Sequence, residues 1–436
     1  MRYMIDEERL EMNSKDLIGK IAEGSFDEAL ANMYGREALT AQRERYSRAL
    51  ERFEELYPGS EEVRIFSAPG RTEVCGNHTD HQRGRVLAAA INLDAVAVVG
   101  FHEEGVIRLQ SEGYQAELID LKALQANEAE HGTTAALIRG MAAQFAELGC
   151  NIGGFNAYVT SDVLGGSGLS SSAAFEVLVG TILDEYYNDG RAGAVEIAKM
   201  GQLAENHYFG KKCGLMDQMV SSVGGFVFID FADTRKPVIE KHTCDFAAAG
   251  ISLCITDTKG SHADLTPDYV AVPSEMKAVA ACFGKEVLRE VPEQEFFAAI
   301  GSLRGKVSDR AILRAAHFYG DDARVAKEVE ALDAADFQRF FELVKESGNS
   351  SARWLQNVYS IKKPEEQGVS LGLMVSEKVL AGRGAYRVHG GGFAGTIQAF
   401  VPDELVAEYV AAMESLFGEG CCYRLKIRPV GGVRVM

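Results

Sequence analysis

The pattern of hydrophobic and polar positions divides the chain into a helical start, a strand-rich middle and a helix-rich end. Residues 1–57 are charged, and their apolar residues have a helical spacing that stops at Pro58 and Gly59, which predicts a helical N-terminal extension. Runs of alternating or continuous apolar residues follow, and the first of them is expected to break at Pro69 and Gly70. We expect strands at residues 63–70, 85–101, 106–113, 153–163, 224–231 and 250–258.

Helical periodicity dominates after about residue 270. Residues 385–401 predict a strand, a turn and a second strand, and residues 423–436 predict a last strand. Strands and helices are interspersed without strict β-α-β alternation, so we expect an α+β fold. The change in pattern predicts two domains, 58–245 and 246–436, after the extension 1–57. Helices are expected at 171–187, 194–210, 273–291, 292–303, 308–332, 333–359 and 403–418.

The charge of the chain excludes some partners. The 436 residues are 47% hydrophobic and carry a formal net charge of −18, which repels phosphate backbones and anionic lipids, so we expect no nucleic-acid or membrane binding. The most apolar stretch, 86–101, contains Asn92 and Asp94 and is too short to span a bilayer. Eight cysteines without a CxxC pair, and an N-terminus without an apolar signal core, indicate a cytoplasmic protein with reduced thiols. We expect a monomer or a weak homo-oligomer.

A stretch rich in glycine and serine, "LGGSGLSSSAAFEV" (164–177), is the strongest local signal for function. It lies between a predicted strand and a predicted helix. Its glycines allow positive φ, and free N–H groups, hydroxyls and the positive end of the helix would converge there as a cradle for phosphate. The alternative is a simple Gly/Ser turn with a serine N-cap. The candidate cofactor-binding residues are Gly165, Gly166, Ser167, Gly168, Leu169, Ser170, Ser171 and Ser172.

Other nucleotide-binding and hydrolase motifs are not matched. GxxxxGK[ST] is absent, and GxSxG fails because Leu169 stands where its last glycine should be. The stretch "GGGFAG" (390–395) does match GxGxxG, but a strand is predicted after it, where a dinucleotide site needs a helix. We expect a turn there in which glycines allow close backbone approach.

Two carboxylates and one arginine are candidates for chemistry. Asp217 lies between two methionines and is expected to be partly buried, although an Asp in a first helical turn is common. Glu205 lies near a predicted helix end, where a solvated carboxylate is the simple alternative. Arg71 follows a glycine and is ordinary as a surface charge, but beside a catalytic Asp it would neutralise charge developing on a phosphoryl group.

The stretch "GNHTDH" (76–81) concentrates hydrogen-bonding groups in one turn. Asn77, His78 and Asp80 offer donors and acceptors that could grip several hydroxyls of a sugar, whereas the simple alternative is a polar surface loop. A metal site competes with this interpretation. The two histidines supply too few oriented ligands for it, and no HExxH or CxxC motif completes the set.

Four motifs in order resemble the GHMP small-molecule kinases, and galactokinases most closely. "GRTEVCGNHTDHQRG" (70–84) is similar to GRxNxxGEHTDYxxG, and "LGGSGLSSSA" (164–173) is similar to PxGxGLSSSA. "ENHYFGKKCGLMDQ" (205–218) matches ENxxxGxxxGxMDQ, and "GGGFAGTIQA" (390–399) is similar to GxGFGGxxxA. One such motif would be weak evidence, but four in order make chance improbable.

The resemblance implies an N-terminal domain like ribosomal protein S5 domain 2, a C-terminal ferredoxin-like domain, and a site between them. It implies transfer of the γ-phosphoryl group of ATP to the anomeric hydroxyl of galactose. Asp217 and Arg71 fall on the family's catalytic positions, and residues 165–172 on its ATP phosphate loop. Ser172 and Glu205 fall near positions associated with Mg²⁺. The positions implied to bind sugar are those of Asn77, His78, Asp80 and Tyr269.

The chain also departs from the family pattern. Asn77 and His81 replace a Glu and a Tyr, and Leu164 and Ala394 replace a Pro and a Gly. Asn77 loses the charge-assisted bond that a carboxylate makes and adds a donor, so another sugar, such as N-acetylgalactosamine, arabinose or a heptose, stays open. A non-catalytic sugar sensor is the alternative of a different class. Arg71, Asp217 and the complete "GLSSSA" sequence argue against it.

Overall fold

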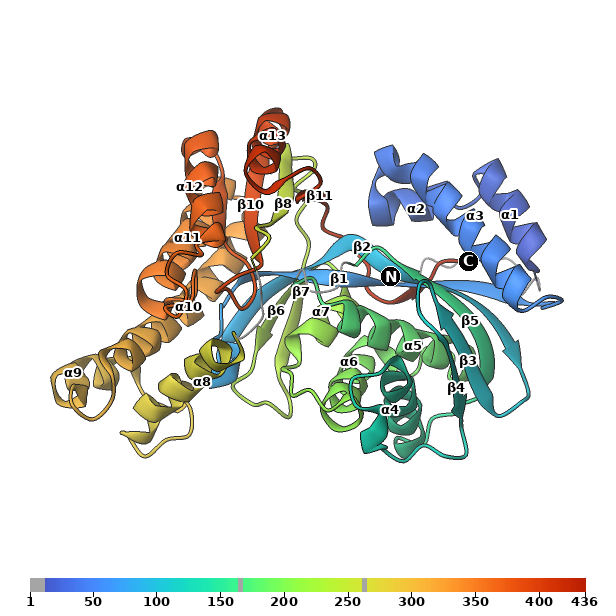
Figure 1. Ribbon diagram of the computed structural model, residues 1–436, viewed down its shortest axis with the longest axis horizontal. Coiled ribbons are helices and arrows are strands. Elements are labelled where there is room, and N and C mark those ends of the chain that lie inside the picture. The colour runs from blue at the N-terminus through green and yellow to red at the C-terminus, as the bar shows by residue number, and fades with distance from the viewer. Residues whose placement is uncertain (1–11, 164–167, 261–264) are drawn as a thin grey trace.

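Two antiparallel-rich sheets form the core of the computed structural model, which describes residues 12–163, 168–260 and 265–436 (Figure 1). The larger sheet has the strand order β12-β1-β2-β5-β3-β4, and β6 and β7 continue it from β2. The smaller sheet has the order β11-β8-β10-β9. Strands of the larger sheet are β1 (Val63–Cys75), β2 (Arg85–His102), β3 (Val106–Ser111), β4 (Ala116–Asp120), β5 (Gly154–Ser161), β6 (Phe226–Asp230), β7 (Val238–His242) and β12 (Val433–Arg434).

One face of the larger sheet is covered by four helices that follow its strands. Apolar residues of β1, β2 and β5, such as Phe66, Ala97 and Phe155, pack with Met141, Leu178 and Ile182 from these helices. The alternating burial of the strands therefore has a partner layer, as the sequence pattern requires. The helices are α4 (Thr134–Glu147), α5 (Ser171–Tyr187), α6 (Gly193–Ala204) and α7 (Met216–Val223), and a π-helical turn, Glu205–Phe209, follows α6.

The N-terminal extension covers the opposite face of the same sheet (Figure 1). Leu50 and Phe53 of the extension pack with Val96, Val98 and Tyr158 of the sheet in one buried cluster. Without these helices, that face would expose a continuous apolar surface. The extension is thus a third layer of the fold, formed by α1 (Ser14–Glu23), α2 (Asp27–Tyr34) and α3 (Leu39–Leu56).

The smaller sheet and most of the remaining helices form the C-terminal part. The chain leaves the larger sheet after β7 and enters the smaller one at β8, yet β12 returns to pair with β1 through Phe66↔Arg434. The domain limits at 57/58 and 245/246 stay predictions. The elements are β8 (Ile251–Asp257), α8 (Thr266–Ala281), α9 (Glu293–Leu303), α10 (Asp309–Asp333), α11 (Phe337–Ser350), α12 (Gly368–Leu380), β9 (Ala385–Val388), β10 (Thr396–Pro402), α13 (Val406–Phe417) and β11 (Cys422–Leu425).

Several sequence-based boundaries are wrong, and two of them involve a proline. The first strand does not break at Pro69 and Gly70 but continues to Cys75, because a register shift between Pro69 and Arg71 absorbs the irregularity, and proline is tolerated at a bulge. The helix expected at 273–291 is α8, which starts at Thr266, contains Pro273 and ends at Ala281. Tertiary packing of α8 around Val272 and Met276 outweighs the proline signal.

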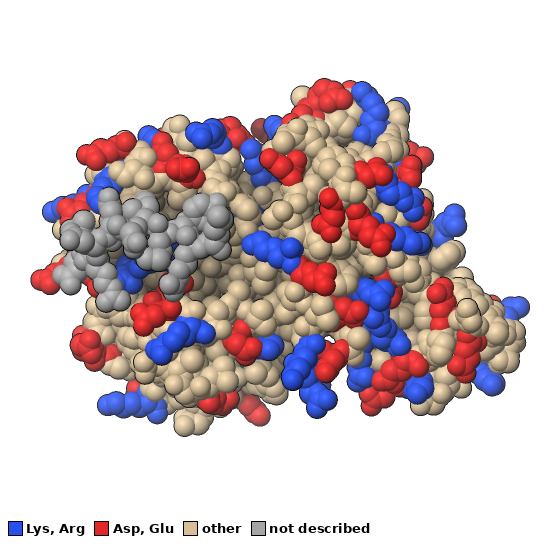
Figure 2. Space-filling model, turned by 180° about the vertical axis from the view of Figure 1, so that it is seen from behind, with Lys and Arg blue, Asp and Glu red and all other residues tan. Residues whose placement is uncertain are grey.

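The surface carries charges of both signs. Acidic and basic side chains are interspersed over the described part of the face drawn in Figure 2, without a broad basic band. In the described ranges, no helix combines the length and apolar character needed to cross a bilayer.

A buried charge cluster ties the extension and the C-terminal segment to the larger sheet. Asp94 on β2 is fully buried and accepts hydrogen bonds from Arg45 of α3 at 2.7 Å and from Arg428 at 2.8 Å. Tyr34 of α2 and Ser67 of β1 also donate to Asp94. One carboxylate therefore satisfies donors from four separate segments of the chain.

Replacing Asp94 by Asn should lower the free energy of unfolding by about 3–5 kcal/mol, because the buried guanidinium of Arg428 would lose its counter-charge and that of Arg45 would keep only the half-exposed Asp162. Urea denaturation without ligands measures this. Asp309→Asn is the matched control, because Asp309 forms an exposed pair with Arg304 that solvent screens, so a much smaller change is expected. Equal losses in both variants would contradict the role of the cluster.

Candidate active site

An ion pair between Arg71 on β1 and Asp217 in the first turn of α7 lies at the centre of the candidate site. Arg71 Nε donates to Asp217 Oδ1 at 2.8 Å, and Arg71 Nη2 donates to Asp217 Oδ2 at 2.6 Å. This two-point contact fixes the orientation of the carboxylate. Arg71 is buried, whereas the Asp217 side chain remains 31% exposed, so the carboxylate can still meet a ligand. The two predicted catalytic residues, far apart in the sequence, are thus brought together.

The glycine- and serine-rich stretch packs directly onto Arg71. Leu169 O accepts a hydrogen bond from Arg71 N at 3.1 Å, and Gly168 O accepts one from Arg71 Nη1. A Cβ on Gly70 would lie 2.7 Å from Leu169 O, so only glycine allows the two backbones to approach this closely. The predicted cofactor residues Gly165, Gly166 and Ser167 lie outside the described residues.

The start of α5 lies beside this ion pair. Ser170 precedes the helix with a φ of 61°, and its side chain donates to Asp217 instead of capping the helix. Among the described residues, no side chain caps the N–H groups of the first turn, which begins at Ser171. A helix start of this kind binds anions through these donors and the positive end of the helix dipole.

A second polar cluster lies behind the first turn of α5. Ser172 Oγ donates to Glu205 Oε1 at 3.1 Å, and Lys211 Nζ lies 3.0 Å from the same oxygen. Gln218 Nε2 bridges Glu205 and Glu176, at 3.0 Å and 2.9 Å. Glu205 lies on the π-helical turn, a local distortion that is common at functional sites. The predicted metal residues Ser172 and Glu205 are therefore in direct contact.

Three predicted sugar-binding residues lie against two neighbouring segments. His78 and Tyr269 contact the glycine loop 390–395 of the C-terminal part, and Asp80 faces the chain before α7. His78 Nε2 donates to Gly391 O at 3.1 Å, and Tyr269 Oη donates to Gly392 O at 2.8 Å. Burial, together with the neighbouring His81, lowers the pKa of His78 to about 4, so this imidazole is neutral near pH 7. Asp80 faces the chain just before α7, since a Cβ on Gly214 would lie 2.9 Å from Asp80 Oδ2.

Asn77, the fourth predicted sugar residue, is fully buried and bonded to protein on all sides. Its backbone N–H donates to Asp321 at 2.9 Å, and its carbonyl accepts from His317 Nε2 at 3.0 Å. Both partners lie on α10. The backbone of the "GNHTDH" turn is thus anchored to the C-terminal part.

Comparisons with known proteins agree with this arrangement. Residues 51–101 match the galactokinase galactose-binding signature, and residues 136–225 match the N-terminal domain of GHMP kinases. The chain is 31% identical to a galactokinase of Streptomyces coelicolor over 367 residues, which are 84% of this chain and 92% of that relative.

The chain belongs to the galactokinase family of GHMP kinases.

Solved structures agree on the fold. The structure of Lactococcus lactis galactokinase complexed with galactose superimposes with a TM-score of 0.74 at 24% identity, covering 88% of this chain and 98% of that one. Mevalonate kinase from Methanococcus jannaschii gives a TM-score of 0.59 at 15% identity, covering 83% and 98%. The two-domain GHMP kinase fold expected from the sequence is confirmed.

Several polar residues of this galactokinase-family site were not singled out from the sequence. His389 Nδ1 lies 2.8 Å from Thr396 Oγ1, and its Nε2 lies 3.1 Å from Thr72 Oγ1 on β1, so it joins the two parts of the protein. Burial, with Arg71 next in effect, lowers the pKa of His389 to about 3, which keeps the ring neutral. The sequence signal that could have indicated His389 is its position after a predicted strand, in "RVHGGG". Other residues missed in this way are Glu73, Glu176, Lys211 and Gln218.

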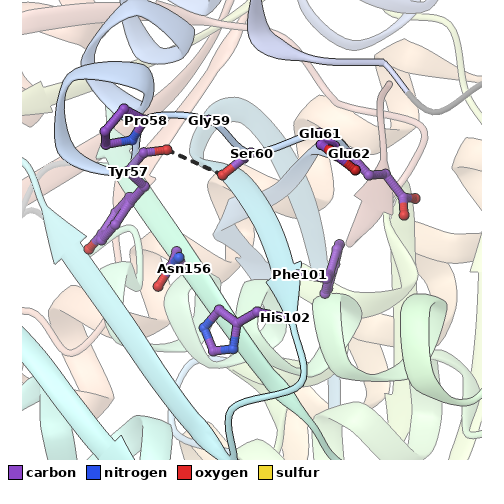
Figure 3. A pocket seen from close by; sticks show the side chains of 9 residues that line it. All are labelled: Tyr57, Pro58, Gly59, Ser60, Glu61, Glu62, Phe101, His102 and Asn156. Atoms are coloured by element: carbon purple, nitrogen blue, oxygen red, sulfur yellow. Dashed lines mark hydrogen bonds between the residues drawn. The ribbon is translucent and has the colours of Figure 1, made fainter.

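A separate surface pocket of about 430 Å³ lies where α3 leads into β1 (Figure 3). Tyr57, Ser60, Phe101, His102 and Asn156 are among the residues around it. None of the nine lining residues belongs to the candidate site. The pocket is therefore distinct from the place where Arg71 meets Asp217.

The ionisation of Glu176 gives a test of the polar cluster. Burial, with the nearby Glu205 adding to it, raises the pKa of Glu176 well above its ordinary value, so the folded protein binds a proton there more tightly than the unfolded chain does. The stability from this proton is complete below the unfolded pKa, about 4.3, and is lost as the pH rises toward the folded pKa. Glu176→Gln lacks this loss, so its free energy of unfolding should rise relative to the wild type from pH 5 to pH 8.

Urea denaturation of the ligand-free protein at several pH values measures this difference. Glu196→Gln on the neighbouring helix α6 is the control, since Glu196 is half-exposed and paired with Lys199. A difference that stays constant with pH for Glu176→Gln would mean that Glu176 is ionised in the folded protein.

Proposed function

We propose that the protein transfers the γ-phosphoryl group of ATP to the C1 hydroxyl of galactose, giving galactose 1-phosphate and ADP. The observation that carries the proposal is the two-point contact of Arg71 with Asp217, beside the glycine- and serine-rich stretch whose Leu169 O accepts a hydrogen bond from Arg71 N. The galactose-binding signature over residues 51–101 and the identity to a galactokinase support galactose as the acceptor.

In this proposal Asp217 is the base and Arg71 neutralises charge. Asp217 accepts the proton of the C1 hydroxyl while the sugar oxygen forms a bond to the γ-phosphorus. The bond between that phosphorus and the bridging oxygen to the β-phosphate breaks, and the electron pair leaves with ADP. Arg71, which already holds Asp217 at two points, faces the negative charge that spreads over the phosphoryl oxygens in such a transfer.

Residues 165–172 and the N-terminus of α5 bind the phosphates of ATP in this proposal. Ser172 and Glu205 would hold Mg²⁺, which supplies charge neutralisation to the phosphates when bound. The donor set fits this ion, because both groups are oxygen ligands in contact and the Lys211 ammonium already occupies a cation position beside Glu205.

The sugar lies beside Asp217 in this proposal, with His78, Asp80 and Tyr269 around it. Asn77 holds the backbone of the turn in place. The neutral His78 and the Asp80 carboxylate supply the mixture of donors and acceptors that neutral hydroxyls need. Cytoplasmic location and a monomeric or weakly associated state, as expected from the sequence, are part of the proposal.

Asp217→Asn should lower kcat by about 10²–10⁴-fold, because the amide keeps the shape of the carboxylate but cannot accept the proton. ATP binding, measured by calorimetry, should persist. The control Asp309→Asn, on the exposed surface of α10, should keep wild-type turnover. Turnover of Asp217→Asn near the wild-type level would remove Asp217 from the chemistry.

An assay of ADP release with Mg-ATP and a panel of sugars tests the acceptor. We expect galactose to exceed N-acetylgalactosamine, glucose, arabinose and mannose by at least about tenfold in kcat/KM, the effect of one lost polar contact. Preference for another sugar of the panel would replace galactose as the substrate and leave the kinase chemistry intact.

A further inference from the structure

Two positions of the sugar-site motif have exchanged their chemistry in this protein. The pattern GRxNxxGEHTDY has an amide at its fourth position and a carboxylate at its eighth, whereas this chain has Glu73 and Asn77 there. The two side chains are in contact, since Asn77 Nδ2 donates to Glu73 Oε1 at 2.8 Å. The pair therefore keeps one amide and one carboxylate and reverses only their places.

The amide of Asn77 has no hydrogen-bonding capacity left. Besides Glu73, its Nδ2 donates to Gly390 O at 2.7 Å. Its Oδ1 accepts from Asn357 Nδ2 at 2.7 Å and from Ser351 Oγ at 3.4 Å. A side-chain amide has two donor hydrogens and two acceptor lone pairs, and all four are used. Asn77 would have to break one of these bonds to bind a sugar hydroxyl.

The carboxylate of Glu73, by contrast, keeps one oxygen available. Glu73 Oε1 takes the Asn77 bond and lies 3.5 Å from Arg387 Nη2, which offsets its charge. Glu73 Oε2 accepts no hydrogen bond from the described residues, and the residue is 7% exposed. A carboxylate in such surroundings needs a further donor for its second oxygen.

The strand geometry directs Glu73 toward the reacting groups. Arg71 and Glu73 pair with Ala90 and Ala88 of β2 in regular register, so both side chains leave β1 on the same face. Ala88 and Ala90 pack in one cluster with Met219 of α7, the helix that carries Asp217. Burial raises the pKa of Glu73, while Arg387, the hydrogen bond from Asn77 and then Arg71 oppose this rise.

We propose that Glu73 is a substrate-contacting specificity residue, whose Oε2 accepts a hydrogen bond from one hydroxyl of the sugar bound beside Arg71 and Asp217. Asn77 is then a positioning residue that holds the carboxylate through Oε1. The inference rests on the proposed sugar-kinase function and names the carboxylate of its acceptor site. It also predicts selection against sugars that lack the one hydroxyl facing Glu73.

A comparison of galactose with its 2-, 3-, 4- and 6-deoxy analogues tests the contact. Removing one particular hydroxyl should lower kcat/KM of the wild type by about 10- to 100-fold, the range for a hydrogen bond to a charged group. In Glu73→Gln, the loss of kcat/KM caused by removing that hydroxyl should shrink to below about threefold. The losses caused by removing the other hydroxyls, and the KM for ATP, should stay within about twofold of their wild-type values. A structural role would lower activity on all sugars alike, and that result would overturn the proposal.

An exchange variant tests the pairing. Asn77→Glu alone would place two carboxylates side by side in a buried site, so activity and thermal stability should both fall. Glu73→Asn/Asn77→Glu restores the order of the motif and should recover at least about tenfold in kcat/KM over the single variant. No recovery in a double variant that folds would contradict the pairing. Glu117→Gln on β4 is the charge-matched control for Glu73→Gln, because it also replaces one carboxylate by an amide, and it is expected to behave as the wild type.

Calorimetry of galactose binding separates this inference from the proposed function. A wild type that binds galactose but does not transfer phosphate would contradict the function alone. In that case a galactose affinity of Glu73→Gln equal to that of the wild type would overturn the role of Glu73, and a loss of at least about tenfold would support it.

Discussion

The register shift between Pro69 and Arg71 is the constraint on which the candidate site depends. Before the shift, Phe66 and Ala68 of β1 face the helical layer formed by α4–α6. Side chains alternate along a strand, so without the shift Gly70 and Thr72 would face α7. The shift instead turns Arg71 and Glu73 to that side, where Arg71 meets Asp217. The same irregularity places Gly70 against Leu169 O, which brings the glycine- and serine-rich stretch to the ion pair.

Contacts between the two parts of the protein complete the site. The loop 390–395 accepts hydrogen bonds from Asn77, His78 and Tyr269, and His389 connects to Thr72 beside Arg71. His78 and His389 are neutral because burial lowers the pKa of each, so they bond without adding positive charge to Arg71. The electrostatics near Asp217 are thus set mainly by Arg71 and by the charges around Glu205.

Sequence patterns predict the chemistry more readily than the contacts that support it. Arg71, Asp217, Ser172 and Glu205 lie in contiguous motifs, and the fold and family expected from those motifs are confirmed. Their roles stay predictions, although the structure brings each pair into contact.

The role of residues 1–57 could not be predicted, because it depends on β2 and β5, whose partner residues are remote in the chain. The continuation of β1 through Pro69 likewise depends on pairing with β2, which outweighs the local proline signal. The Glu73–Asn77 exchange escapes a position-by-position comparison, because each change alone looks like a loss and only their contact shows the compensation.

The extension and the site are connected through the register shift. Pro69, the last residue before the shift, pairs with Asp94, the centre of the buried charge cluster. Arg45 and Tyr34 from the extension, and Arg428 from the C-terminal segment, all bind that carboxylate. On the other side of the strand, Ser221 of α7 donates to Pro69 O. The irregular backbone is therefore held from both faces just before Arg71. A guanidinium must be placed to within a fraction of an ångström for a two-point contact. The helices α1–α3 therefore stabilise the geometry of the site, although none of their residues bonds to Arg71 or Asp217.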